Sequence, residues 1–300
     1  MGFAVPQAVN SAPSQNSLAM AALLVGGLAI GGSPIFVRLS EVGPMATAFW
    51  RVALALIPLV VWSRLRNGAI DDRRPERLSD YALLVLPGIF LAIDLGAWHL
   101  SLAMTSVANA TLLANLAPVF VTLASWALFR SPVSGLFAVG LGTAVAGVVV
   151  LNGVPNSLGG GELTGDAVAI VAAMFYAGYI LAIGRLRSRF GTNRIMIWST
   201  ASAAACILPM TLLTEAVLFA PSAFGWAMLI GLAFVSHAGG QVAITYALAY
   251  LPPAFSSLTL LLQPVVAAAL AWGLLGEPVG FMQAIGGTIV LIGILIARRG

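Results

Sequence analysis

The stretch LANLAPVFVTLASWALFRSP at residues 113–132 recurs in altered form as LTLLLQPVVAAALAWGLLGEP at residues 258–278. A shift of 146 positions places Pro118 on Pro264 and Trp126 on Trp272. The same shift aligns further pairs of proline and glycine: Pro132 with Pro278, Gly140 with Gly286, and Gly147 with Gly293. Chance would align the common leucines and alanines, but not readily rare tryptophans and prolines at one offset. The chain therefore contains an internal repeat.

The chain around these two copies is too apolar for a soluble protein. Of its 300 residues, 60% are hydrophobic and 8% are charged, whereas a soluble domain has roughly 25% charged residues. The composition thus indicates a helical membrane protein that crosses the bilayer several times. The net charge of +4 does not indicate binding to nucleic acid, because the positive residues lie in short loops beside apolar runs.

Ten apolar runs are predicted to span the membrane as helices of about 20 residues each. Residues 1–17 are expected to form a disordered cytoplasmic tail, residues 18–152 a first repeat of five spans, residues 153–163 a periplasmic linker, and residues 164–300 a second repeat. The ten runs are 18–37, 45–63, 81–102, 106–129, 133–151, 164–184, 194–214, 223–248, 253–274 and 279–297.

The arginines predict how these spans are oriented. All 14 basic residues are arginine, and cytoplasmic loops of membrane proteins are enriched in basic residues. With the N-terminus inside, 12 arginines lie in inside loops or at the C-terminus, Arg38 lies outside, and Arg51 lies within the second span. Both ends of the chain are therefore predicted to be cytoplasmic. The replacement of every lysine by arginine favours a bacterial inner membrane.

A repeat unit of five spans has a structural consequence. Because five is odd, two consecutive units must enter the membrane from opposite sides, which makes an inverted repeat. The predicted fold is an all-α membrane protein in which ten transmembrane helices form two inverted five-helix repeats around a central cavity. Such a repeat gives a transporter a basis for alternating access, since each half can adopt the conformation of the other.

Three segments carry a resemblance to a known family. They are GGSPIFVRLSEVGPMATAFWR at residues 31–51 and the two repeated stretches that end in FRSP and LGEP. With them the chain resembles the drug/metabolite transporter superfamily in its ten-span EamA-type branch, and within that branch the YddG-type exporters of aromatic amino acids. The resemblance implies two five-helix baskets around a central cavity and export of small metabolites. Glu277 fits the acid that the family carries before the final proline, whereas Ser131 in the first half departs from it.

Charged side chains near the centre of a span are costly and need an explanation. Asp94 and Trp98 lie one helical turn apart in the third span, and His237 and Gln241 do the same in the eighth. A local shift of 143 places Asp94 on His237, so both polar faces are expected to line the substrate path and to bind an amino group, a carboxylate or a proton. The alternative is a buried structural pair. His99 points away from this face, and packing is expected there.

Spans four, six and nine add neutral polar and aromatic candidates. Thr111 and Asn115 in span four and Gln263 in span nine precede the shared proline and can read a polar ligand, or can bond between helices. Tyr176 and Tyr179 share a face of span six and, with Trp98, suit a partly apolar ligand, although packing in the core is the alternative.

Other residues are assigned to the shape of the bundle. Pro34, Pro118 and Pro264 interrupt their spans as hinges or kinks, and a freed helix N-terminus there can hold a ligand carboxylate. The sequence does not decide between these roles. Arg51 is expected to reach the outer surface or to pair with Glu41, a structural role in either case.

These observations favour an exporter of amino acids, aromatic or other apolar ones, over other classes. An exporter of several drugs or lipophilic cations, or a carrier of another small metabolite, remains an alternative. No HExxH or GxSxG motif indicates an enzyme. The absence of lysine excludes Schiff-base chemistry, and one cysteine and two histidines argue against a metal site, so no cofactor is expected. The expected partners are a small-molecule substrate and the lipid bilayer, with protons left open, and neither nucleic acid nor an obligatory protein partner.

Overall fold

The computed structural model describes residues 13–65, 74–105, 107–152, 163–276 and 280–300, and over these residues the chain forms helices and no strand. Eight helical stretches are long and apolar enough to cross a membrane, and two shorter apolar helices, Gly135–Leu151 and Phe281–Ala297, complete the set. The ten spans predicted from the sequence are confirmed. The linker 153–163, apart from Leu163, and Glu277 lie outside the described residues.

Six spans are continuous helices, although proline lies inside three of them. They are α3 (Pro44–Leu65), α4 (Leu78–Met104), α7 (Gly135–Asn152), α8 (Leu163–Leu186), α9 (Thr192–Thr214) and α14 (Phe281–Ala297).

Three spans are broken where the sequence places a proline. Span one consists of α1 (Pro13–Gly31) and α2 (Ser33–Leu39), span four of α5 (Val107–Ala114) and α6 (Ala117–Phe129), and span nine of α12 (Pro253–Thr259) and α13 (Leu262–Leu275). Pro34, Pro118 and Pro264 each lie in the first turn of the second piece. Proline fits there because the first turn needs no N–H from it, and it cannot continue a preceding helix. The helix α1 begins at Pro13, within the segment expected to be a tail.

The eighth span contains an unusual segment. Between α10 (Ala223–Gly231) and α11 (Val242–Ala247) the chain forms a π-helix, η1 (Leu232–Gln241). A π-helix is wider than an α-helix and turns side chains out of the 3.6-residue register, and such segments occur often at functional sites. The spacing of His237 and Gln241 in the sequence predicts an ordinary α-helix in this span, which is wrong.

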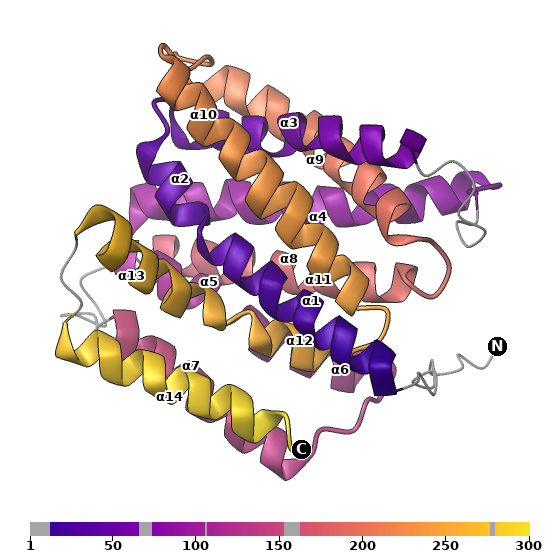
Figure 1. The fold of residues 1–300 in the computed structure, drawn as a ribbon, viewed down its shortest axis with the longest axis vertical. Helices are drawn as coiled ribbons and strands as arrows, with labels where there is room; N and C mark the ends of the chain where they lie inside the picture. The colour runs from indigo at the N-terminus through magenta and orange to yellow at the C-terminus, as the bar shows by residue number, and fades with distance from the viewer. Residues whose placement is uncertain (1–12, 66–73, 106, 153–162, 277–279) are drawn as a thin grey trace.

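The contacts between helices follow a two-fold exchange of the repeats. Equivalent spans pack on each other, with α7 against α14, α3 against α9, and α6 against α12. Contacts between non-equivalent spans also occur twice. The contact of α4 with α8 has its equivalent in the contact of η1 and α11 with α1, and the contact of α4 with α9 has its equivalent in that of η1 with α3. Inside the bundle, α4 packs on α8 and α9, and η1 packs on α1 and α3, while α7 and α14 form one edge (Figure 1).

Small residues form the seam between α7 and α14. A methyl group on Gly140 would collide with Ala297, and one on Gly286 would collide with the backbone of Leu151. The second pair of contacts is equivalent: Gly293 faces Ala144, and Gly147 faces Val290. Each contact therefore appears twice with the roles exchanged at the offset of 146. As residue numbers rise along α7 they fall along α14, so the two helices are antiparallel, as an inverted repeat requires.

Candidate functional site

Arg51 on α3 is the centre of a polar cluster inside the bundle. Its guanidinium lies within electrostatic range of Asp94 on α4 and of Tyr176 and Tyr179 on α8, and His237 on η1 lies in the same range. Arg51 is half-buried. The interpretation of Arg51 as a residue that reaches the outer surface is therefore wrong, and so is its pairing with Glu41.

Glu41 has a different partner. Its carboxylate accepts hydrogen bonds from the backbone N–H of Ser222 at 3.1 Å and from the hydroxyl of Ser222 at 2.7 Å, at the beginning of α10. Glu215 binds the N–H of Met45 in α3 at 2.9 Å in a similar way. Both acids thus stabilise helix N-termini, where negative charge is favourable, and neither is available to Arg51.

Arg51 and Asp94 carry opposite charges within electrostatic range of each other, inside spans where an isolated charge would be costly. The Nε atom of Arg51 is buried and has no hydrogen-bond partner. Buried donors are rarely left without a partner, so Nε of Arg51 is a candidate donor for a ligand.

Tyrosine and glutamine side chains form the second part of the cluster. The rings of Tyr176 and Tyr179 are stacked, with centroids 5.9 Å apart. The hydroxyl of Tyr179 donates to Oε1 of Gln241 at 3.4 Å, and the hydroxyl of Tyr176 interacts with the amides of Gln241 and Gln263. The Nε2 atom of Gln263 is buried without a partner, so the cluster holds a second unused donor.

The π-helix positions His237 and Gln241 beside this cluster. Nε2 of His237 is 3.0 Å from the hydroxyl of Thr200 on α9, and His237 is almost fully buried. Gly240 lets η1 approach α1 closely, because a side chain there would collide with Ile30. Ser236 also donates to the carbonyl of Ala29 at 2.9 Å. In the sequence, the adjacent glycines Gly239 and Gly240 are compatible with such an irregular helix.

Asn115 and Trp98, two further predicted site residues, take part in hydrogen bonds within their own spans. Asn115 donates to the carbonyl of Thr111 at 2.9 Å, which satisfies backbone where span four is broken. Trp98 is half-buried on α4, and its carbonyl accepts from Ser101 at 2.7 Å. The side chain of His99 lies outside the described residues.

The arrangement favours binding over covalent chemistry. It offers a guanidinium with an unused donor, a neighbouring carboxylate, two side-chain amides and a stacked pair of aromatic rings. Within the described part of the chain, no group of three or more His, Cys, Asp or Glu side chains could hold a metal ion.

Comparisons with known proteins agree with the repeat. The sequence model of the EamA-like transporter family matches residues 17–153 and again residues 163–299. Two uncharacterized transporters of Archaeoglobus fulgidus are each 27% identical, one over 272 residues, with 88% of this chain and 92% of the relative covered, and the other over 281 residues, with 93% and 96% covered. One crystal structure shares the fold with a TM-score of 0.79, covering 96% of this chain and 98% of the other at 18% identity.

Proposed function

The chain belongs to the EamA-like transporter family, and we propose that it exports amino acids, most of all aromatic or other apolar ones, by alternating access across a bacterial inner membrane. One observation carries the choice of substrate: a guanidinium and a carboxylate lie within electrostatic range of each other inside the bundle, and the guanidinium has a buried donor without a hydrogen-bond partner. A free amino acid carries the two complementary charges on one carbon atom.

The charged pair matches the backbone of an amino acid. Arginine binds carboxylates through two parallel hydrogen bonds, and the unused Nε of Arg51 is one of the donors that this geometry needs. Asp94 then accepts hydrogen bonds from the ammonium group. The ligand would bridge Arg51 and Asp94, which lie within electrostatic range of each other, so that each charge gains a hydrogen-bonded partner in the bound state.

The aromatic pair matches the side chain. Tyr176 and Tyr179 present stacked rings, and aromatic rings favour ligands with an aromatic or apolar body because they bury a large area with defined geometry. The resemblance to YddG-type exporters supports the same choice. Gln241 and Gln263 would orient the ligand through their amide groups.

The broken spans provide the moving parts of this proposal. Span four and span nine each break just before a proline, and α6 and α12 from these spans pack against each other. Rocking of one repeat against the other about such breaks would expose the cluster to one side of the membrane and then to the other. The arginine-rich loops support a cytoplasmic position of both termini in this proposal.

Transport by purified protein in liposomes tests the proposal. Labelled Trp, Phe and Tyr should enter liposomes that contain the protein and not empty ones, with and without a proton gradient. Arg51→Gln should abolish this uptake, whereas Tyr81→Phe on α4, away from the cluster, should not. Uptake equal to that of empty liposomes for all three amino acids would contradict the proposed export of aromatic amino acids. Preferred uptake of a phosphorylated sugar would instead indicate a carrier of another metabolite.

Asp94 also favours a second function, the export of lipophilic cations, since a carboxylate beside aromatic rings can bind an apolar cation. The two functions differ at Arg51. If the substrate is a cation, Arg51→Gln should strengthen its transport by removing a repulsive charge, whereas transport of an amino acid should be lost.

A further inference from the structure

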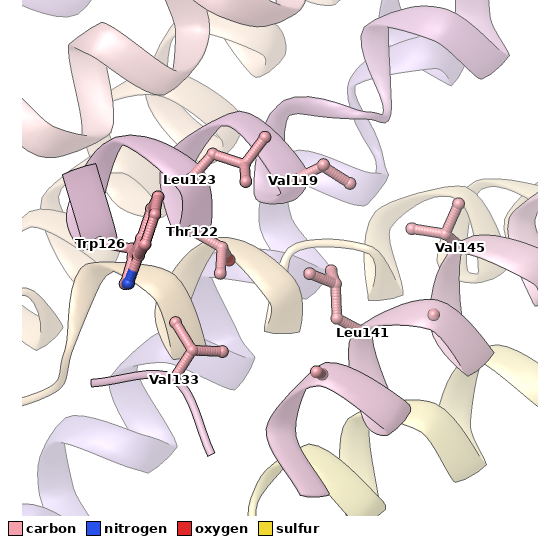
Figure 2. A pocket seen from close by; sticks show the side chains of 9 residues that line it. Val119, Thr122, Leu123, Trp126, Val133, Leu141 and Val145 are labelled. Carbon is pink, nitrogen blue, oxygen red and sulfur yellow. The ribbon is translucent and has the colours of Figure 1, made fainter. Parts of the chain in front are cut away.

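An apolar groove opens on the outer surface of the bundle, between α6 and α7 and away from the polar cluster. It has a volume of about 490 Å³, and Figure 2 shows that side chains from both helices and from the loop between them surround it. Leu123 and Trp126 at this groove are 54% and 61% exposed. The lining includes Val119, Leu123 and Trp126 of α6, Val133 of the loop, and Leu141 and Val145 of α7.

The lining of the groove is almost entirely apolar. The hydroxyl of Thr122 already donates to the carbonyl of Pro118 at 2.7 Å, and the other polar group of the lining side chains is the indole N–H of Trp126. Gly142 leaves open space, because nothing lies within 4 Å of the position where a Cβ would be. In a membrane such a hollow is filled by hydrocarbon, which for a lipid-facing surface is an acyl chain.

Arginines lie at one end of the groove. Arg130 follows α6 and is exposed. The end of α14 packs against the start of α7, with Gly300 beside Ser134 and Phe137, and Figure 1 shows the C-terminus next to the loop between α6 and α7. The exposed Arg298 and Arg299 therefore lie at the same end of α7 as Arg130.

We propose that this groove binds one anionic phospholipid, with an acyl chain between α6 and α7 and the phosphate near Arg130, Arg298 and Arg299. Arginine is well suited to phosphate because it donates several hydrogen bonds in a planar fork, and basic groups at the membrane surface favour anionic lipids. The site requires two features together: the apolar groove between α6 and α7, and the positive charges of the arginines at one end of it.

The repeat offers an internal comparison for this site. At the offset of 146, Arg130 corresponds to Gly276, Leu141 to Gly287 and Gly142 to Thr288. The second half therefore lacks the arginine at the mouth and has a hydroxyl where the first half has open space. Trp272 corresponds to Trp126 and is equally exposed, at 61%, so it reports on ordinary lipid contact.

Fluorescence quenching by lipids with brominated acyl chains tests the proposal. The protein is reconstituted in bilayers with brominated phosphatidylglycerol or brominated phosphatidylcholine at matched mole fractions. The contribution of Trp126 is the difference between the protein and Trp126→Phe, and that of Trp272 is obtained with Trp272→Phe. Phosphatidylglycerol should quench Trp126 at a mole fraction at least about fivefold lower than phosphatidylcholine, the preference expected from one arginine, and Trp272 should show no preference.

Variants separate the groove from its charges. Gly142→Phe should abolish the preference at Trp126 by filling the groove, whereas Gly27→Phe, where a Cβ also meets open space, should leave it intact. Replacement of Arg130, Arg298 and Arg299 by Gln should make both lipids equal. The proposal is overturned if both lipids quench Trp126 equally in the unaltered protein, if the preference survives Gly142→Phe, or if Trp126 is shielded from both lipids because a second copy of the chain covers it.

Discussion

The contacts at the seam between α7 and α14 follow the internal repeat, whereas the residues of the polar cluster around Arg51 do not. At the seam, the contact of Gly140 with Ala297 reappears as that of Gly286 with Leu151, so both repeats contribute equivalent residues. In the cluster, Asp94 on α4 corresponds to His237 on η1 at the local shift of 143. Arg51 of span two has no basic counterpart in the middle of span seven, because the only arginine of the run 194–214 is Arg194 at its start.

This difference separates scaffold from function within one fold. Close packing of small residues is needed in both repeats, because each half must be able to take the place of the other. A ligand with two unlike charged groups has no two-fold symmetry. A site that binds it therefore needs different residues in the two repeats. We therefore expect equivalent substitutions to have equal effects at the seam and unequal effects in the cluster.

The largest effect should come from the seam. Leucine at Gly286 would collide with the backbone of Leu151, where no flexible side chain can move aside, and such overpacking costs about 1–3 kcal/mol of stability or more. Gly286→Leu and the equivalent Gly140→Leu should lower the melting temperature in detergent by similar amounts. Gly273→Leu is the matched control, since nothing lies within 4 Å of its Cβ position. Clearly unequal effects of the two seam variants would break the comparison.

Arg51→Gln should remove transport while the seam stays folded. The loss of a charged hydrogen-bond donor costs about 1.5–3 kcal/mol, or roughly 10-fold to 100-fold in substrate affinity, and Asp94 is left uncompensated. The double variant Arg51→Gln with Asp94→Asn should regain thermal stability but not transport. Binding measured by calorimetry alongside melting checks both parts. Full transport by the single variant would show that Arg51 is structural.

Asp94→Asn should have a smaller effect on binding and a specific effect on coupling. Because the amide keeps the shape of the side chain but carries no proton that can be released, substrate binding should persist, weakened by about tenfold. If protons move through this carboxylate, the response of uptake to an imposed pH gradient should disappear. His237→Asn, at the equivalent position of the second repeat, should leave that response intact. A pH response that is the same in Asp94→Asn as in the unaltered protein rules the carboxylate out of proton coupling.

The smallest effect is expected at the edge of the aromatic pair. Tyr179→Phe removes a single hydrogen bond to Gln241 of 3.4 Å and keeps the ring that stacks on Tyr176. We expect substrate affinity to fall by a few-fold at most, since one neutral hydrogen bond contributes about 0.5–1.5 kcal/mol. Tyr176→Leu, which removes a ring, should reduce the affinity for Trp and Phe more than that for Leu. Equal losses for all three substrates would show that the rings do not select aromatic side chains.

Part of the site was predictable from composition and spacing. Asp94 and His237 were recognised because polar groups in the middle of an apolar span are costly, and Tyr176 and Tyr179 because they share a helix face. Arg51 was misplaced for a physical reason: near the end of a predicted span, a long side chain can reach either the membrane surface or the interior, and the sequence does not show which neighbours surround it. The π-helix could not be predicted, because the spacing of His237 and Gln241 fits the register of an α-helix.

The sequence by itself determined the class of the protein, its ten spans, their breaks at Pro34, Pro118 and Pro264, and the internal repeat. These follow from local rules, since hydrocarbon excludes charge and unpaired backbone groups and proline cannot continue a helix. Only the tertiary structure decided that α3, α4, α8 and η1 converge on Arg51, and that the end of α14 lies beside the loop before α7. Such meetings depend on how helices far apart in the chain pack, and packing is a property of the whole bundle that no single span encodes.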